Sequence, residues 1–554
     1  MRFTSAMVAC LWLSGMTPAG AAPDLVIVDA KVFTADPART SAQAVAVEKG
    51  RISFVGRSED ARKLAGRSTR VIQAGGRLLV PGLIEAHGHA GPYPPGARID
   101  LPGLPWPGPT PDQTLDAVRR TAAIERGWAL GTIGAAMMAD GRDWRTALDS
   151  VAPDTPVLLR PWWGHGMTVN SRALDVLGIR DFDADPIGGW YGRTPAGRLN
   201  GRIREAAEIK VIRRLSEAVP SAEAAKRFAD TGRMYAGWGV TSFHQMANSL
   251  SLAATLAALG AATPTIKWSV YAWGLPNASV SEAWSELSSA PPAPPLVRVA
   301  GSKWMLDATP IERDAHLRAP YVGNPTNRGR SNFTAAELRQ ILRGALKERR
   351  QLALHVSGDG EMARLFAAME KAAPAATWRT RRVRIEHGDG LTPDLLAQAK
   401  RLGVVLVENP LHLAPSRDET GGEMMVTRLG QERARDFQLL KSALAAGVPL
   451  ALGSDAGGEV ANPFLNIMLA VRYDRNPSEA ISREQALTAY TAGAAFAEGE
   501  EKTKGRIAPG MAADLAMLSQ DILTIPIDAL PGTRSLLTLV DGRIVHEDIA
   551  LSGK

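Results

Sequence analysis

Two histidines separated by one glycine follow an apolar run early in the chain. The run VPGLIEA leads directly into His87, Gly88 and His89. Side chains two positions apart on a strand point to the same face, and glycine lets the backbone turn where the strand ends. Both imidazoles can then reach one cation, because histidine nitrogen is a common zinc ligand. Alone, the pair also fits ordinary surface or packing histidines.

Three further residues able to bind a metal stand at the ends of later apolar runs. His355 ends LALH, His387 ends RIEH, and Asp455 follows LALGS. Each has a simpler explanation by itself, namely a core histidine or, for Asp455, a turn or helix cap. Together with His87 and His89 they supply the ligands that a hydrolytic zinc site needs. The set predicts a metal centre that activates water.

Lys303, in the run GSKWMLD, also stands at a strand end. An ammonium group cannot bind a metal, but a desolvated lysine has a depressed pKa and its neutral amine can add carbon dioxide. The resulting carbamate would be an anionic bridge between two ions roughly 3.5–4 Å apart, the spacing of a two-metal hydrolytic site. The alternative is an ion-paired lysine whose stem packs against apolar surface.

The elements that must position these residues alternate between strand-like and helical runs. After Pro81 the candidate strands are LIEAHGH, PVLLRPWW, GVTSFHQM, TIKWSVYAW, VRVAGSKWMLD, QLALHVSG, RVRIEHGD, GVVLVENP and PLALGSD. This alternation predicts an α/β fold, a TIM-like (β/α)8 barrel, in which functional side chains gather at the C-terminal ends of the strands. PVLLRPWW is one strand too many. We therefore assign residues 97–228, roughly, to an insertion after barrel strand 1 that covers the active site.

Both ends of the chain contain short β-rich runs separated by glycine and polar turns. Neither end has enough strands for a stable sheet core of its own. We therefore predict one small β-sandwich domain made from residues 22–80 and 505–554, beside a barrel domain of residues 81–504.

The first 21 residues have the pattern of a signal peptide. Arg2 precedes an apolar run that is too short to span a bilayer, and Ala19 to Ala21 form a small-x-small cleavage site. Cys10, the only cysteine, lies in this leader, so the mature chain would use neither disulfides nor thiolate catalysis. We expect export, to the periplasm if the source is Gram-negative.

The composition restricts the partners. The chain has 554 residues, is 45% hydrophobic and carries a formal net charge of +7. Its basic residues are scattered, without the clusters and interleaved aromatics of a nucleic-acid site, and no run after the leader approaches the roughly 20 apolar residues of a membrane helix. We expect a small-molecule substrate, no nucleic acid and no membrane span. The oligomeric state leaves no clear trace.

The order of these residues along the chain resembles the pattern of the amidohydrolase superfamily. That order is the paired histidines, the lysine, the next two histidines and the aspartate. The closer resemblance is to family 3 of the superfamily, which contains YtcJ-like proteins and N-substituted formamide deformylases. Supporting segments are VNSRALDVLGI, AGRLNGRIREA, GVTSFHQM, LHVSGD, RIEHGD, NPLHLAP, LGSDA and KGRIAPGMAADLAML. The resemblance covers nearly the whole chain after the leader. It implies a metal-dependent hydrolase that cleaves an amide-like C–N bond.

The resemblance also implies residue roles. His87 and His89 would hold one ion, Lys303 as a carbamate would bridge, and the remaining two strand-end histidines, His355 and His387, would hold a second. Asp455 would contact metal and act as general base. Zinc suits these ligands, although Mn, Fe or Co could replace it and one ion could suffice.

Other matched positions point to the substrate. His165 and Asn170, in GHGMTVNSRAL, and His412, in NPLHLAP, fall in family segments near the pocket. Helix capping is the competing explanation for Asn170, and packing for His412.

The chain departs from the family pattern around the ligands. Glu85-Ala86, Asp307-Ala308-Thr309, Gly388-Asp389 and Glu408-Asn409 replace the usual residues at four places, which changes the pocket wall and leaves every ligand in place. Ester, lactone or imide hydrolysis, or deacetylation, would use the same site. An inactive exported binding protein is a further alternative.

Overall fold

The computed structural model describes residues 22–101, 108–125 and 127–548. The predicted signal peptide, with Cys10, lies outside the described residues. Within the described part of the chain, no helix has both the length and the apolar character needed to cross a membrane.

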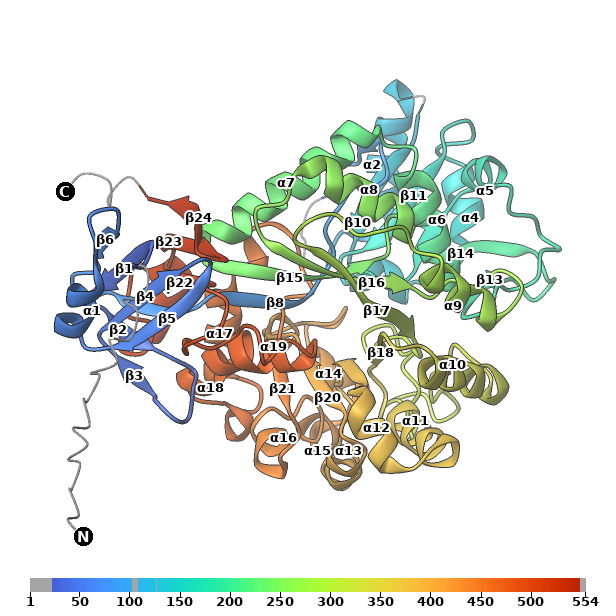
Figure 1. Cartoon of the computed structure of the whole chain (residues 1–554). Coiled ribbons are helices and arrows are strands. Elements are labelled where there is room, and N and C mark those ends of the chain that lie inside the picture. Colours follow the sequence, from blue (N-terminus) through green and yellow to red (C-terminus); the bar gives the residue numbers. More distant parts are fainter. Residues whose placement is uncertain (1–21, 102–107, 126, 549–554) are drawn as a thin grey trace, which may run out of the picture.

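Eight parallel strands form a nearly closed barrel at the centre of the molecule (Figure 1). In sheet order they are β8 (Leu83–Gly88), β15 (Val240–Ala247), β16 (Lys267–Trp273), β17 (Val297–Met305), β18 (Gln351–Val356), β19 (Arg384–His387), β20 (Val405–Glu408) and β21 (Leu450–Leu452). Strand order follows chain order throughout, and these are the eight strands predicted from the sequence. The TIM-like barrel is therefore confirmed.

Helices cover the outer face of the barrel. The principal ones are α7 (Ser221–Gly237), α8 (Leu252–Ala262), α9 (Val280–Ser288), α10 (Ala335–Lys347), α11 (Asp359–Ala372), α12 (Ala375–Arg381), α13 (Leu396–Leu402), α16 (Lys441–Ala446), α17 (Pro463–Arg472), α18 (Arg483–Thr488) and α19 (Ala494–Ala497). Helix α10 shows how the sequence fixes their starts. Thr334 accepts a hydrogen bond from the Glu337 N–H, while the Glu337 carboxylate accepts one from the Thr334 N–H. This capping box satisfies N–H groups that a helix start leaves free.

Between β8 and β15 the chain forms a separate six-stranded sheet. Its order is β13 (Gly189–Arg193), β14 (Leu199–Glu205), β12 (Met167–Val169), β11 (Val157–Pro161), β10 (Ala129–Ile133) and β9 (Ala97–Arg98). Helices α2 (Pro111–Ile124), α4 (Trp144–Asp149), α5 (Ser171–Leu177) and α6 (Ala206–Ser216) accompany it. PVLLRPWW thus supplies β11 of this sheet and no barrel strand. Two hydrophobic clusters of its own hold this part together.

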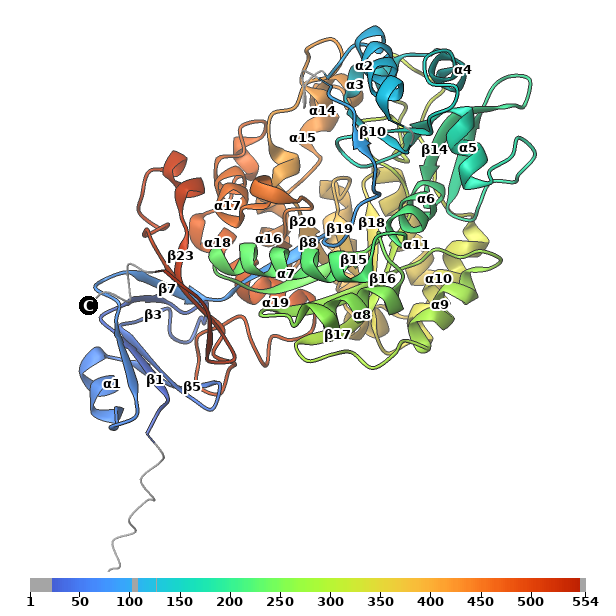
Figure 2. The same cartoon turned by 90° about the horizontal axis from the view of Figure 1, so that it is seen from above.

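Strands from the two ends of the chain lie together at the other end of the molecule (Figures 1 and 2). One sheet has the order β5 (Arg51–Gly56), β4 (Ala44–Glu48), β1 (Leu25–Val28), β6 (Arg70–Gln73). The second is β24 (Arg543–Glu547), β23 (Ser535–Val540), β22 (Leu515–Leu518), β7 (Leu78–Pro81), β2 (Lys31–Phe33), β3 (Ser41–Ala42). Ile27, Leu79 and Leu537 are among the residues of one shared hydrophobic cluster. Lys267, which begins β16, binds Asp514 and Asp541 and ties these sheets to the base of the barrel.

Candidate active site

Four histidine side chains surround the carboxylate of Asp455 at the C-terminal end of the barrel. Asp455 Oδ1 lies 3.1 Å from His89 Nε2 and 3.5 Å from His87 Nε2. Asp455 Oδ2 lies 3.5 Å from His412 Nε2 and 3.8 Å from His387 Nδ1. Asp455 therefore belongs to two trios of nitrogen and oxygen atoms, one on each side, whose members lie within 4.8 Å of one another.

His355 and Lys303 stand beside this group. The ring centroids of His355 and His387 are 4.5 Å apart. The Lys303 Nζ lies 5.8 Å from the ring centroid of Trp273, and the ring of His89 lies 5.8 Å from the same indole. Burial lowers the pKa of Lys303 to about 8, which raises the fraction of neutral amine near pH 7. All six predicted metal-site residues are thus gathered at one mouth.

The backbone turns sharply where two of these strands end. His387 has a φ of 67° and Asp455 a φ of 52°, a region that residues other than glycine rarely adopt. Such conformations cost on the order of 1–3 kcal/mol and persist where the surroundings fix them. One fixing contact is the Asp455 N–H, which donates to the His87 carbonyl at 2.9 Å and joins the ends of β21 and β8.

His87 is held by a buried carboxylate that the sequence analysis missed. His87 Nδ1 lies 2.5 Å from Glu386 Oε2, and Arg384 donates to both oxygens of Glu386. Burial and the nearby Lys303 lower the pKa of His87 to about 4, so its imidazole is neutral at neutral pH. A usable signal lay in the run RIEH, where Arg384 and Glu386 alternate with an apolar residue. Alternate positions share one face of a strand, so both had to face the barrel interior or the helices.

Asn409 and His412 form the wall beside His387. His387 Nδ1 lies 2.8 Å from Asn409 Oδ1. Because an amide oxygen only accepts, His387 Nδ1 is the donor and its Nε2 keeps a lone pair. The ring of His412 stacks on that of His387 with centroids 5.4 Å apart. Asn409 is one of the departures from the family pattern, and it touches a predicted ligand directly.

The inserted sheet supplies another wall of the mouth. The ring of His165 lies 4.9 Å from that of His355, and His165 Nδ1 lies 3.3 Å from Glu205 Oε1. Burial disfavours the imidazolium of His165, but Glu205, Glu312 and Glu208 outweigh this and raise its pKa to about 9. At neutral pH His165 is therefore a cation with two N–H donors. Sequence reasoning found His165 and missed the three glutamates, of which Glu205 and Glu208 lie together in the insertion and Glu312 follows β17.

Asn170 has a different position. It caps helix α5, where its Oδ1 accepts hydrogen bonds from the N–H groups of Ala173 and Val157 at 2.9 and 3.0 Å. Its Nδ2 donates to two backbone carbonyls at 2.8 and 2.9 Å, and the side chain is fully buried. Its hydrogen-bonding capacity is used within the protein. This geometry favours the capping explanation over substrate binding.

Glu85, another departure from the family pattern, contacts the backbone of the predicted ligand His87. Its Oε1 accepts hydrogen bonds from the N–H groups of His87 and Ser454 at 3.1 and 2.7 Å. Burial raises its pKa to about 8, so Glu85 is a neutral acid near pH 7. It joins β8 to the chain after β21 without placing a further charge beside the mouth.

The sequence matches the model of the Amidohydrolase family over residues 70–546. YtcJ of Bacillus subtilis (strain 168) is 27% identical, over 91% of this chain and 96% of that relative. The N-substituted formamide deformylase of Arthrobacter pascens is 28% identical, over 95% of this chain and 98% of the relative. A metal-dependent hydrolase from Pyrococcus horikoshii OT3 has a similar fold, with a TM-score of 0.67 and 21% identity over 91% of this chain and 99% of that one. The chain belongs to the amidohydrolase family and is an enzyme, which confirms the predicted resemblance.

Proposed function

We propose that this enzyme hydrolyses an amide-like C–N bond of a small molecule and uses one or two divalent metal ions. The convergence of His87, His89 and His387 on the Asp455 carboxylate carries the proposal, since it puts imidazole nitrogens and a carboxylate oxygen at one mouth. Membership of the amidohydrolase family supports it. So does the name of one relative, an N-substituted formamide deformylase.

The residues at the mouth fit a divalent cation. His87 Nε2 is buried and has no hydrogen-bond partner among the described residues, although it points toward Asp455. His89 Nδ1 lies 3.0 Å from the Met246 carbonyl, which only accepts, so Nδ1 is the donor and Nε2, 3.1 Å from Asp455 Oδ1, is the nitrogen that would bind a metal. Both paired histidines thus direct Nε2 toward Asp455, and the set of nitrogen and oxygen donors suits Zn²⁺.

We assign the roles as follows. His87 and His89 would hold one ion, His355 and His387 would hold a second, and Lys303 as a carbamate would supply a shared anionic ligand. Bound metal would lower the pKa of water toward neutrality and polarise the substrate carbonyl.

The proton transfers belong to Asp455. Its carboxylate accepts a proton from the attacking water and passes it to the leaving nitrogen. We assign His165 and His412 to the substrate, as N–H donors on two walls of the mouth.

Elemental analysis of the purified enzyme, followed by a substrate panel, tests the proposal. We expect one or two equivalents of zinc or a similar ion, with hydrolysis of N-acyl compounds or formamides that a chelator abolishes and added metal restores. Esters, lactones, imides and N-acetylated compounds of matched size complete the panel and locate the scissile bond. Absence of both bound metal and hydrolysis would contradict the proposal and favour an inactive binding protein.

We also propose the domain organisation and the location of the enzyme. Residues 22–80 and 505–554 make one β-sandwich, residues 81–504 the barrel, and residues 97–228 its insertion. The hydrophobic cluster shared by both terminal segments supports the first assignment. Residues 1–21 act as an export signal. Cell fractionation with N-terminal sequencing of the mature protein tests this, and a cytoplasmic protein that keeps its leader would refute it.

A further inference from the structure

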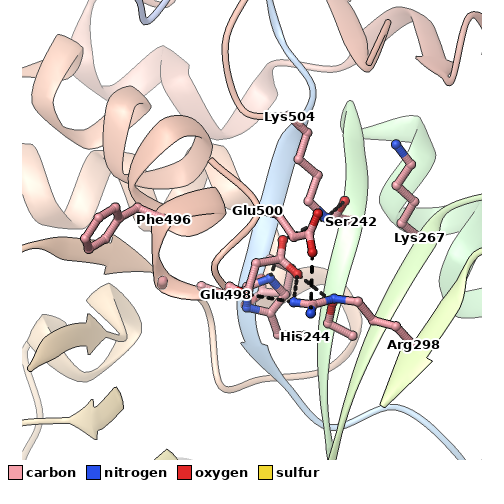
Figure 3. A network of polar contacts seen from close by, with 12 residues as sticks. Ser242, His244, Lys267, Arg298, Phe496, Glu498, Glu500 and Lys504 are labelled. Carbon is pink, nitrogen blue, oxygen red and sulfur yellow. Dashed lines mark hydrogen bonds and ion pairs between the residues drawn. The ribbon is translucent and has the colours of Figure 1, made fainter. Parts of the chain in front are cut away.

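A continuous line of buried polar side chains runs through the barrel from its base to His87. Glu498 Oε1 lies 3.1 Å from His244 Nε2, and His244 Nδ1 lies 2.9 Å from Arg384 Nη1. Arg384 Nε donates to Glu386 Oε1 at 2.7 Å, and Glu386 Oε2 lies 2.5 Å from His87 Nδ1. None of the five side chains has exposed surface. Figure 3 shows the lower end of this line, around Glu498.

Arg384 is the centre of the line because all five of its N–H donors have an acceptor. Two of these hydrogen bonds go to the carboxylate of Glu386, at 2.7 and 3.0 Å. One goes to His244 Nδ1 and one to the Tyr271 hydroxyl, both at 2.9 Å. The fifth goes to the carbonyl of Ala86 at 2.6 Å. Arg384 therefore holds His87 in two ways, through the peptide group that precedes it and through the carboxylate on its ring.

The donors in this line fix which nitrogen of each histidine carries the proton. A guanidinium group only donates, so His244 Nδ1 accepts and His244 Nε2 carries the proton that faces Glu498. A carboxylate only accepts, so His87 Nδ1 carries the proton that faces Glu386 and leaves its Nε2 lone pair toward Asp455. This is the arrangement in which a carboxylate orients a metal-binding histidine.

The base of the line is anchored by a charged network. Glu498 accepts hydrogen bonds from the Ser269 hydroxyl at 2.5 Å and from Arg298 at 2.8 Å, and Lys504 Nζ lies 2.7 Å from its Oε1. Lys504 also donates to the Ser242 hydroxyl at 2.9 Å. Figure 3 shows these side chains grouped where the chain after α19 meets the strands β15 and β17. The network fixes His244 from below.

Such an interior is a costly way to hold a barrel together. TIM barrels usually fill this space with branched apolar side chains. Replacing buried ion pairs with apolar residues of similar volume is often neutral or stabilising by 1–4 kcal/mol. Stability alone therefore does not account for a fully satisfied buried guanidinium, whereas the orientation of a metal-binding imidazole does.

We propose that Arg384 is a positioning residue for His87, and that His244 and Glu498 hold Arg384 in place from the base of the barrel. The proposal rests on the proposed function, because it takes His87 to be a metal ligand. It extends the functional site from the mouth to the far end of the barrel. It also predicts that lysine cannot replace Arg384, since one ammonium group cannot reach the Ala86 carbonyl, Glu386 and His244 together.

Metal affinity of the variants Arg384→Lys and His244→Phe tests this, with Thr241→Val as the matched control. Thr241 is buried on the same strand as His244, but its hydroxyl donates to the Leu83 carbonyl and not to a member of the line. Apo-protein is titrated with Zn²⁺ against a competing chelator, and the visible spectrum of the Co²⁺ form reports the geometry of the ligands. We expect Arg384→Lys to weaken binding about 10- to 100-fold and alter the Co²⁺ spectrum. His244→Phe should do the same to a smaller degree, and Thr241→Val should match the wild type.

The outcomes separate this inference from the proposed function. If the wild type binds metal and both folded variants bind it with unchanged affinity and spectrum, the positioning role is wrong and the metal centre stands. If the wild type binds no metal, the proposed function itself fails. Circular dichroism confirms folding, and if Arg384→Lys does not fold, His244→Phe alone decides the question.

Discussion

Two histidines on different walls of the mouth have pKa values that are shifted in opposite directions. His87, at the end of a barrel strand, has its pKa lowered to about 4 by burial and by Lys303. The side chain of His165, in the insertion, is 12% exposed, and Glu205, Glu312 and Glu208 outweigh its desolvation and raise its pKa to about 9. Burial alone therefore does not set the charge of an imidazole here, because the neighbouring charged side chains also shift its pKa.

The difference in charge suits the histidines on the two walls to different tasks. Burial lowers the pKa of His87, His355 and His387 at the strand ends, which keeps these imidazoles neutral, as metal ligands must be. The insertion holds an imidazolium, which suits a donor of hydrogen bonds to a substrate carbonyl or carboxylate. We infer that the barrel carries the chemistry and the insertion the recognition. Substitutions on the barrel wall should then stop turnover, and those on the insertion wall should change it by degrees.

Asp455→Asn should produce the largest effect. The amide keeps the shape of the side chain and its oxygen can still contact metal, but it cannot take a proton from water. We expect most of the metal to remain and kcat to fall at least 10²- to 10⁴-fold, the range that general-base catalysis contributes. Steady-state kinetics and elemental analysis on one preparation measure both. Turnover close to the wild-type value would exclude Asp455 as the base.

Lys303→Ala should change the metal content. Without the side chain that we assign as a carbamate bridge, the second ion loses a ligand, and we expect the content to fall toward one ion per chain. If the wild type itself holds one ion, the prediction becomes no change in content. Two ions retained in the variant would exclude a bridging role for Lys303. Mass spectrometry of the native wild type, which detects an added carbon dioxide, provides an independent check.

The barrel and its ligands could be predicted from the sequence because each strand end is a local pattern. Eight apolar runs with helices between, four of which end in His or Asp of the predicted ligand set, restrict the topology to very few folds. PVLLRPWW could be set aside because a barrel closes at eight strands and its surroundings lack the alternation. Asn170, in contrast, shows the limit of matched segments. Only the structure revealed that its amide is used entirely inside the protein.

The supporting charges could not be predicted in the same way. Glu386 and Arg384 lie within a predicted strand, but their partner His244 is 140 residues away from Arg384 in the chain. The acidic neighbours of His165 are likewise dispersed, with Glu205 in the insertion and Glu312 after β17. A charged residue in an apolar run signals an interior partner. It does not say which one.

The low pKa of His87 predicts a loss of stability in acid. In metal-free enzyme its folded-state pKa of about 4 lies below the ordinary 6.5, so the unfolded chain binds more protons between these values. The contribution is present above pH 6.5 and is lost as the pH falls through 4. The difference corresponds to about 3 kcal/mol. Urea unfolding of the wild type and His87→Gln, with chelator present, should show the wild type losing more stability than the variant across this window.

The high pKa of His165 predicts the opposite slope on the alkaline side. Its folded-state pKa of about 9 lies above the ordinary 6.5, so the folded enzyme binds more protons between these values. The stability that it contributes is fully present below pH 6.5 and disappears as the pH rises through 9. The pKa shift corresponds to a stability contribution of at most about 3 kcal/mol, and partial exposure of His165 at the mouth reduces it. The free energy of unfolding of the wild type should therefore exceed that of His165→Gln by less and less as the pH rises from 6.5 to 9.

Glu312→Gln sharpens the same test. Removing one of the carboxylates that raise the pKa of His165 should move the alkaline loss of stability to lower pH, while the acid-side loss that belongs to His87 stays where it is. Urea unfolding of the wild type, His165→Gln and Glu312→Gln over the same series of pH values makes the comparison. If the advantage over His165→Gln were flat from pH 6.5 to 9, His165 would be neutral in the folded enzyme. The two walls would then differ in position and not in charge, and the division of work between them would lose its physical basis.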